Sequence, residues 1–250
     1  LSILGQTIDY GPYGWLENYD PHWTPNTTDL QHKRYHFGKQ PNMALWNLTQ
    51  LANALYPLIE EAEPLQQILN EYKRDYTLGF HKMICEKLGL YLHEEVADGF
   101  IILLEDNLEK SQIDMTLFFR KISAEQKLDF VSFWTILEDC TYFIIEEILK
   151  EKAHWEMWFS NYEALLEKEK VAPALRSSKM KTVNPKYVLR NYMAQLAIDA
   201  AEDGDNSLVD ELYTLLLEPY SEQPEMEKWF AKRPDWAMHK VGCSMLSCSS

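Results

Sequence analysis

The longest regular pattern in the chain is a helical spacing of apolar residues in the proline-free stretch between Pro64 and Pro173. Pro64 suits the first turn of a helix, and the apolar positions after it recur every three or four residues, so they share one helix face: Leu65, Ile68, Leu69, Tyr72, Tyr76, Phe80, Met83 and Ile84. The same spacing predicts further helices at residues 43–56, 94–109, 124–150, 153–170, 186–202 and 206–217. We therefore expect a mainly α-helical protein.

Strand-like sequence is confined to the first dozen residues, where "SIL" and "TIDY" flank Gly5-Gln6 as two strands flank a tight turn. We expect a short β-hairpin at this N-terminal end. Three of the nine glycines of the chain, Gly5, Gly11 and Gly14, lie in this stretch, and Asp9 lies among them. A backbone bent in this way would present the carboxylate of Asp9 at the end of a strand.

The charge of the chain argues against some classes of partner. It has 39 acidic and 24 basic residues, a formal net charge of −15, which repels phosphate backbones and anionic lipid. We therefore expect no nucleic-acid partner. No window approaches the roughly 20 apolar residues of a membrane span, so we expect no membrane insertion. Because Leu1 is not an initiator methionine, we also expect the chain to begin inside a longer protein.

The four cysteines lack the density and spacing of a disulfide framework, which favours a reducing compartment. Cys85 and Cys140 lie in helical, partly apolar contexts, and we expect both to be buried thiols. Cys243 and Cys248 lie in the small, Ser-rich sequence "GCSMLSCSS", which predicts a flexible, exposed tail. Exposed thiols in such a tail are candidates for redox chemistry.

Several other motifs have simple structural interpretations. His32 and His36 lie in a long polar loop with no cysteine nearby, so a solvated or capping role is preferred to a zinc site. The sequence has no Gly-x-Ser-x-Gly, no phosphate-loop pattern and no dinucleotide glycine pattern. We expect a core position for Trp46, Leu48 and Leu51.

In "NPKYVLRNY", Asn184 suits a helix N-cap and Pro185 the first helical position. We therefore expect a helix to begin there. Arg190, which follows in the same motif, is interpreted as a buried ion-pair partner and not as a nucleotide contact.

The N-terminal end contains an Asp-aromatic-Gly triplet, formed by Asp9, Tyr10 and Gly11. A strand ending in Asp-aromatic-Gly, followed by a long loop and a helical bundle, is the local order of the metal-binding segment in protein-kinase-like folds. Mg²⁺ needs a hard, charged oxygen ligand, and a following glycine lets the backbone turn away from the nucleotide phosphates. The triplet therefore makes Asp9 the candidate metal ligand.

The surrounding sequence makes this interpretation more specific. Five stretches, in this order and across nearly the whole chain, resemble the selenoprotein O family: "SILGQTIDYGPYGWLENYDP", "QPNMALWNLTQLANAL", "VNPKYVLRNYMAQLAIDAA", "KRPDWA" and the terminal "SCSS". The resemblance implies a kinase-like fold that binds ATP and transfers AMP to Ser, Thr or Tyr hydroxyls of protein substrates. It also implies Mg²⁺, or Mn²⁺ in its place, and a cytoplasmic location in a bacterium or a mitochondrial one in a eukaryote.

By this resemblance the chain is the C-terminal helical lobe of the kinase-like fold. Residues 1–20 would form the metal-binding hairpin, 21–42 an activation-type loop, 43–235 the helical bundle and 236–250 the cysteine-containing tail. Asp9 matches the family's second metal ligand, which also touches the nucleotide phosphates.

The resemblance places the general base, the other metal ligand and the phosphate-binding residues before Leu1, so this chain alone would be inactive. It also shows two departures. The loop after Asp9 reads Thr24-Pro25-Asn26 where some relatives carry a cysteine, which puts a disulfide to the tail in doubt, and the selenocysteine of some relatives is absent.

Two other classes of function stay open from the residues themselves. A metal-binding aspartate would serve an ordinary phosphotransferase equally well, because the residues that orient the nucleotide lie outside the chain. An acidic, aromatic-rich helical bundle could also be a non-enzymatic interaction module.

Overall fold

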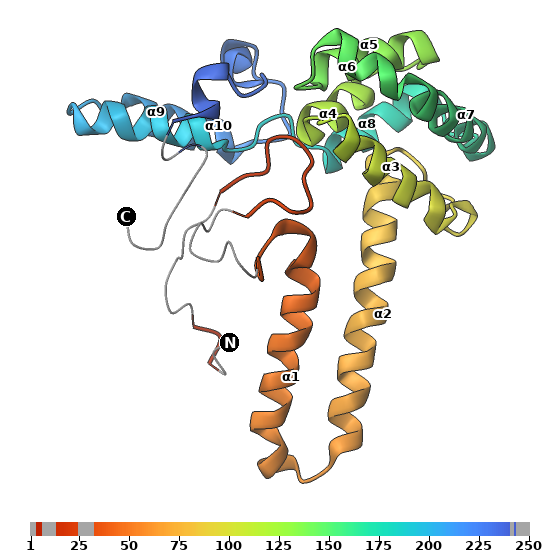
Figure 1. The fold of residues 1–250 in the computed structure, drawn as a ribbon, viewed down its shortest axis with the longest axis vertical. Coiled ribbons are helices and arrows are strands. Elements are labelled where there is room, and N and C mark those ends of the chain that lie inside the picture. The colour runs from red at the N-terminus through yellow and green to blue at the C-terminus, as the bar shows by residue number, and fades with distance from the viewer. Residues whose placement is uncertain (1–3, 7–13, 25–32, 241–242, 244–250) are drawn as a thin grey trace. The chain divides into compact units, whose positions relative to one another are not determined.

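The computed structural model describes residues 4–6, 14–24, 33–240 and 243 (Figure 1). The chain divides into two compact units. The first comprises Leu1–Gly14, Asp20–His81 and Met245–Ser250, and the second comprises Trp15–Tyr19 and Lys82–Ser244. The five residues Trp15–Tyr19 therefore leave the first unit and belong to the second, and the two units are described separately below.

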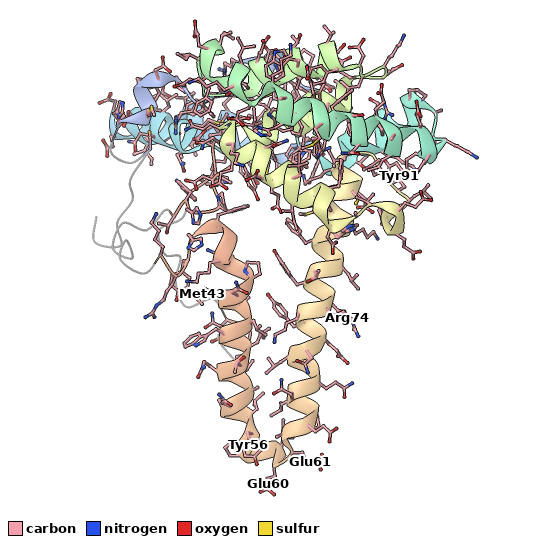
Figure 2. The ribbon with its side chains drawn as sticks, turned by 45° about the vertical axis from the view of Figure 1, so that its right-hand side comes forward. Met43, Tyr56, Glu60, Glu61, Arg74 and Tyr91 are labelled. Atoms are coloured by element: carbon pink, nitrogen blue, oxygen red, sulfur yellow. The ribbon has the colours of Figure 1, made fainter. Side chains whose placement is uncertain are left out.

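The first unit contains two long helices, α1 (Gln40–Ile59) and most of α2 (Ala62–Lys87), preceded by a short 3₁₀ helix η2 (Phe37–Lys39). The helices run side by side in opposite directions (Figures 1 and 2). Glu60 ends α1 in a left-handed conformation with φ 60°, and its N–H donates to the carbonyl of Tyr56. At the other end of the pair, the Tyr72 hydroxyl donates to the Pro41 carbonyl at 3.1 Å.

The core of the second unit is built from aromatic side chains. This part of the second unit contains η3 (His93–Glu95), α3 (Asp98–Lys110), α4 (Met115–Ala124), α5 (Phe130–Cys140), α6 (Ile145–Ile148), η4 (Leu149–Glu151), α7 (Lys152–Glu169) and α8 (Pro173–Val183). Helix α4 packs against α5 and α8, and α3 packs against α7. Rings of Phe133 and Phe159 lie 4.8 Å apart between centroids, and the buried Trp155 indole donates to the Ser111 hydroxyl at 2.8 Å. The polar atom of a buried aromatic is thus satisfied.

A second apolar cluster lies in the C-terminal part of the same unit. It is formed around α9 (Asn191–Glu202), α10 (Ser207–Leu217), η5 (Pro224–Trp229) and η6 (Asp235–Met238). Its buried members are Tyr187, Tyr192, Met193, Ala197, Leu212, Leu215, Trp229, Ala237 and Cys243. Two residues of the predicted tail, Ala237 and Cys243, therefore belong to a packed core.

The mainly helical class is confirmed, and most predicted helices are present within a few residues of their expected positions. The predicted helix at 124–150 is wrong, because two separate helices and a 3₁₀ turn occupy it. Asp129 caps the start of α5 by accepting from Ser132 N–H at 2.8 Å. The chain then turns at Thr141, which pairs in an isolated bridge with Ile113, so that tertiary pairing interrupts the helical pattern.

The predicted helix start at Asn184 is also wrong. Asn184 ends α8, and the N–H groups of Lys186 and Tyr187 donate to the Pro219 carbonyl at 2.8 and 3.1 Å. These long-range bonds keep the chain extended until α9 begins at Asn191. Helices α4 and α8 were not predicted.

The predicted core position of Trp46 is wrong, since its side chain is 54% exposed. Leu48 and Leu51 are half-buried. The predicted β-hairpin lies almost wholly outside the described residues, and the described part of the chain has two isolated bridges and no strand.

Candidate functional site

A buried cluster of charged side chains ties the N-terminal end of α9 to the start of α4. We call Glu17, Asp114, Tyr142 and Arg190 the carboxylate cluster. Arg190 directly precedes α9, and Asp114 is the N-cap of α4, where it accepts from the Leu117 N–H at 3.1 Å. An aspartate suits this position because it satisfies a free N–H of the first turn and opposes the helix dipole.

Arg190 holds Asp114 with both ends of its guanidinium. Its Nη1 lies 2.6 Å from Asp114 Oδ2, and its Nη2 lies 3.0 Å from Asp114 Oδ1. Nη1 also lies 3.1 Å from Glu17 Oε2, and the Tyr142 hydroxyl donates to Asp114 Oδ2 at 3.0 Å. The side chains of Arg190 and Asp114 are 3% and 0% exposed, so the fork-shaped pair is shielded from water.

The cluster contains two carboxylates for one guanidinium. Glu17 is 5% exposed, and its Oε1 has no hydrogen-bond partner among the described residues. Burial raises the pKa of Glu17, and the charge of Arg190 opposes that rise only in part. Burial, followed by the charge of Asp114, raises the pKa of Tyr142, which keeps its hydroxyl protonated as a donor.

The residues Trp15–Tyr19, which we call the anchored segment, are bonded along their length to this part of the second unit. At one end, Trp15 N–H donates to Asn191 Oδ1 and Asn191 Nδ2 donates to the Trp15 carbonyl, each at 3.0 Å. At the other end, Tyr19 N–H donates to the Ile113 carbonyl at 2.8 Å. With Glu17 held by Arg190 between them, the segment is fixed at both ends and in the middle.

The predictions for Arg190 and for two of the cysteines are confirmed. Arg190 is a buried ion-pair partner. Cys85 and Cys140 are both fully buried, and burial raises the pKa of Cys85 to about 11. Such thiols remain protonated at neutral pH and are poor nucleophiles.

The predicted exposure of Cys243 is wrong. Its residue is 6% exposed, it packs in the C-terminal apolar cluster, and burial raises the pKa of its thiol. The small residues around it in sequence suit close packing as well as they suit a mobile tail. Cys248 lies outside the described residues, so the redox role of the two thiols stays a prediction.

Asp9 also lies outside the described residues. Within the described ranges, no group of three or more His, Cys, Asp or Glu side chains could hold a metal ion. The role of Asp9 as a Mg²⁺ ligand therefore stays a prediction. Among the described helices, none is long and apolar enough to cross a membrane.

Sequence reasoning missed Glu17 and Asp114 as members of the carboxylate cluster, and Asn191 as the partner of Trp15. Asp114 had a local signal, since Asp followed by "MTLFF" is typical of an N-cap before an apolar helix. Glu17 and Asn191 had none, because their partners lie 173 and 176 residues away in the sequence.

Comparison with known proteins relates this chain to a family. The family model described as protein adenylyltransferase SelO matches residues 1–217. A protein nucleotidyltransferase YdiU from Flavobacterium johnsoniae is 56% identical over 251 residues, which cover 100% of this chain and 48% of that protein. A protein of the same name from Rhodopirellula baltica is 47% identical, again over 100% of this chain and 48% of the relative.

The chain thus spans about half the length of these relatives. The family match, by contrast, takes in most of the chain and includes both Asp9 and the carboxylate cluster. These 250 residues belong to the SelO family of protein adenylyltransferases.

Proposed function

We propose that the full-length protein transfers AMP from ATP to Ser, Thr or Tyr hydroxyls of protein substrates. The observation that carries this proposal is the match of the SelO model to residues 1–217. The names of the bacterial relatives, protein nucleotidyltransferases, agree with it. The relatives are bacterial, and for a bacterial source we propose a cytoplasmic location, with a mitochondrial one for a eukaryotic source. The net charge of −15 makes nucleic acid a poor partner.

In this proposal Asp9 is a ligand of the catalytic metal, Mg²⁺ or Mn²⁺, and contacts the nucleotide phosphates through it. The metal would neutralise negative charge that develops on the phosphates during transfer. The general base and the phosphate-binding residues belong to the part of the protein outside these 250 residues. The chain would be the C-terminal lobe of a kinase-like fold and inactive by itself.

The described residues contribute by holding the chain that follows Asp9. Asp9 lies six residues before Trp15. Six residues span at most about 20 Å when fully extended, so fixing Trp15 limits where the Asp9 carboxylate can lie. Arg190 and Asn191 are then positioning residues, because they act on the reaction through the anchored segment and do not touch the reacting atoms.

Mass spectrometry of the full-length protein, incubated with ATP, Mg²⁺ and a mixture of candidate protein substrates, tests the proposed activity. Transfer of AMP adds about 329 Da to a protein, whereas transfer of phosphate adds about 80 Da. We expect the larger mass. The smaller one would indicate a phosphotransferase, and no added mass would indicate a binding module.

A further inference from the structure

Helix α1 has an unusual composition for a helix with an open surface. Its 20 residues, Gln40–Ile59, contain no Asp, Glu, Lys, Arg or His, although charged residues make up 25% of the chain. A helix without a charged face is typical of the interior of a protein. Yet none of these residues, all of which the structure describes, is buried.

The exposed side of α1 is uncharged along its whole length. Positions that recur at spacings of three and four are exposed and carry one large aromatic residue among amide and small side chains: Asn42, Trp46, Gln50, Asn53, Ala54 and Pro57. We call these six residues the outer face of α1. The small side chain of Ala54 would allow another backbone to approach closely, and Trp46 offers a large apolar surface.

Helix α2, which belongs largely to the same unit, has a charged surface that is exposed to solvent. Helix α2 carries exposed charged residues, among them Arg74 and Asp75, which pair at 2.9 Å with side chains 64% and 65% exposed. Arg74 projects outward from α2 (Figure 2). The absence of charge on α1 is therefore a property of that helix and not of the unit.

We propose that the outer face of α1 packs against the part of the full-length protein that lies outside these 250 residues. The relatives are about twice as long as this chain, which covers 48% of each, so a full-length protein of their size would hold a partner for this face. Its contact surface would be uncharged, because an unpaired charge facing Trp46 and Ala54 would be buried at high cost. It would also offer hydrogen-bond partners to the amides of the outer face, since buried amides need them.

The proposed function gives a second reason for this contact, and this second reason rests on that proposal. Helix α1 begins 31 residues after Asp9 in the sequence. If the general base and phosphate-binding groups lie elsewhere in the protein, some surface of this chain must hold them near Asp9. The charge-free face of α1 is suited to that task.

Photo-cross-linking in the full-length protein identifies what covers α1. Trp46→benzoylphenylalanine places a photoreactive aromatic group within the outer face. We expect cross-linked peptides that join residue 46 to residues outside this chain. Cross-links to residues 82–244, cross-links between two copies, or no cross-link at all would each overturn the proposal. The matched control, Tyr213→benzoylphenylalanine on α10, replaces an aromatic residue that is 66% exposed, and we expect only background yield.

A thermal-melting comparison provides the second measurement. Alanine and lysine both favour helices, so Ala→Lys costs little on an open helix surface but buries a charge in an interface. In the full-length protein we expect Ala54→Lys to lower the melting temperature by at least about 4 °C and Ala164→Lys, at an exposed position of α7, to change it by less than about 1 °C. Equal effects of the two variants would contradict the proposal.

Neither measurement depends on AMP transfer. A protein that cross-links from residue 46 as expected but transfers no nucleotide would contradict the proposed function alone. A protein that transfers AMP but shows an open α1 would contradict only the packing of α1.

Discussion

Arg190 and Asp114 form a two-pronged ion pair, with nitrogen–oxygen distances of 2.6 and 3.0 Å, between the residue that precedes α9 and the residue that caps α4. Glu17 adds a second carboxylate to the same guanidinium at 3.1 Å. The pair is shielded from water. If one charged group is removed, water cannot solvate the charges that remain.

Arg190→Met in the full-length protein tests the energetic weight of this pair. We expect it to lower the free energy of unfolding by about 3–5 kcal/mol, because two buried carboxylates lose the guanidinium that bonds both of them. Urea denaturation followed by circular dichroism measures the change. The control is Lys181→Met, which breaks the partly exposed pair with Glu222 and should cost less than about 1 kcal/mol. Similar losses in both variants would show that the buried cluster contributes no more to the free energy of unfolding than a partly exposed ion pair does.

Glu17→Gln should change stability in a pH-dependent way. The folded-state pKa of Glu17 is raised above its ordinary value of 4.5, mainly by burial. The folded protein therefore binds this proton more tightly than the unfolded chain. The stabilising contribution of Glu17 is fully present below the unfolded pKa and is lost as the pH rises through the folded pKa.

Two denaturation series, for the parent and for Glu17→Gln, from pH 4 to pH 7.5 check this sign (range chosen to bracket the titration of the group). We expect the stability of the parent relative to the variant to fall as the pH rises above 4.5. At neutral pH the amide should be tolerated within about 1 kcal/mol, because Arg190 retains Asp114 and Glu17 Oε1 has no partner to lose. A relative stability that rises with pH would show that the ion pair with Arg190 outweighs burial.

Asn191→Ala removes both bonds to the Trp15 backbone and should loosen the anchored segment. In the full-length protein we expect faster amide hydrogen exchange in the peptide that contains residues 15–19. We also expect a several-fold rise in the Mg²⁺ concentration needed for half-maximal AMP transfer, since a looser Asp9 would bind the metal less well.

The control for this variant is Asn184→Ala. Asn184 is also fully buried, and it donates to the Lys87 carbonyl at 2.8 Å without touching the anchored segment. It should lower stability and leave the Mg²⁺ dependence unchanged. If both variants shift the Mg²⁺ dependence equally, general destabilisation explains the effect and the positioning role is lost.

Asp9→Asn in the full-length protein should abolish AMP transfer and leave the melting temperature within about 2 °C of the parent. In the proposed mechanism, losing this carboxylate would weaken binding of the metal, and less metal would be present to neutralise the charge that develops on the phosphates. Transfer assays and thermal melting on the same preparation measure the two effects. Near-normal transfer by the variant would remove Asp9 from the mechanism.

Thiol labelling tests the burial of Cys243. In a Cys248→Ser background, we expect Cys243 of the native protein to react with a thiol reagent at least about tenfold more slowly than after denaturation, because the thiol is enclosed and its pKa is raised. Peptide mapping identifies the labelled residue. Rapid labelling of Cys243 in the native protein would restore the exposed, redox-competent tail that the sequence predicts.

The helical class could be predicted from sequence because it depends on local periodicity, as in α2, α7 and α10. The errors arose where distant partners compete with local preference. "NPKY" fits a helix start in isolation, but the bonds of Lys186 and Tyr187 to Pro219 hold it extended. For Arg190, the sequence predicted a buried ion pair, but neither partner could be named, since Glu17 and Asp114 lie 173 and 76 residues away.

During synthesis, the anchored segment is made long before two of its bonding partners. Trp15 and its partner Asn191 are separated by 176 residues, and Glu17 and Arg190 by 173. At 5–20 residues per second, the ribosome needs roughly 9–35 s to supply these partners after the segment has been made. Trp15 and Glu17 therefore cannot form these bonds on the nascent chain until residues 190 and 191 have been synthesised, although Tyr19 can meet Ile113 earlier.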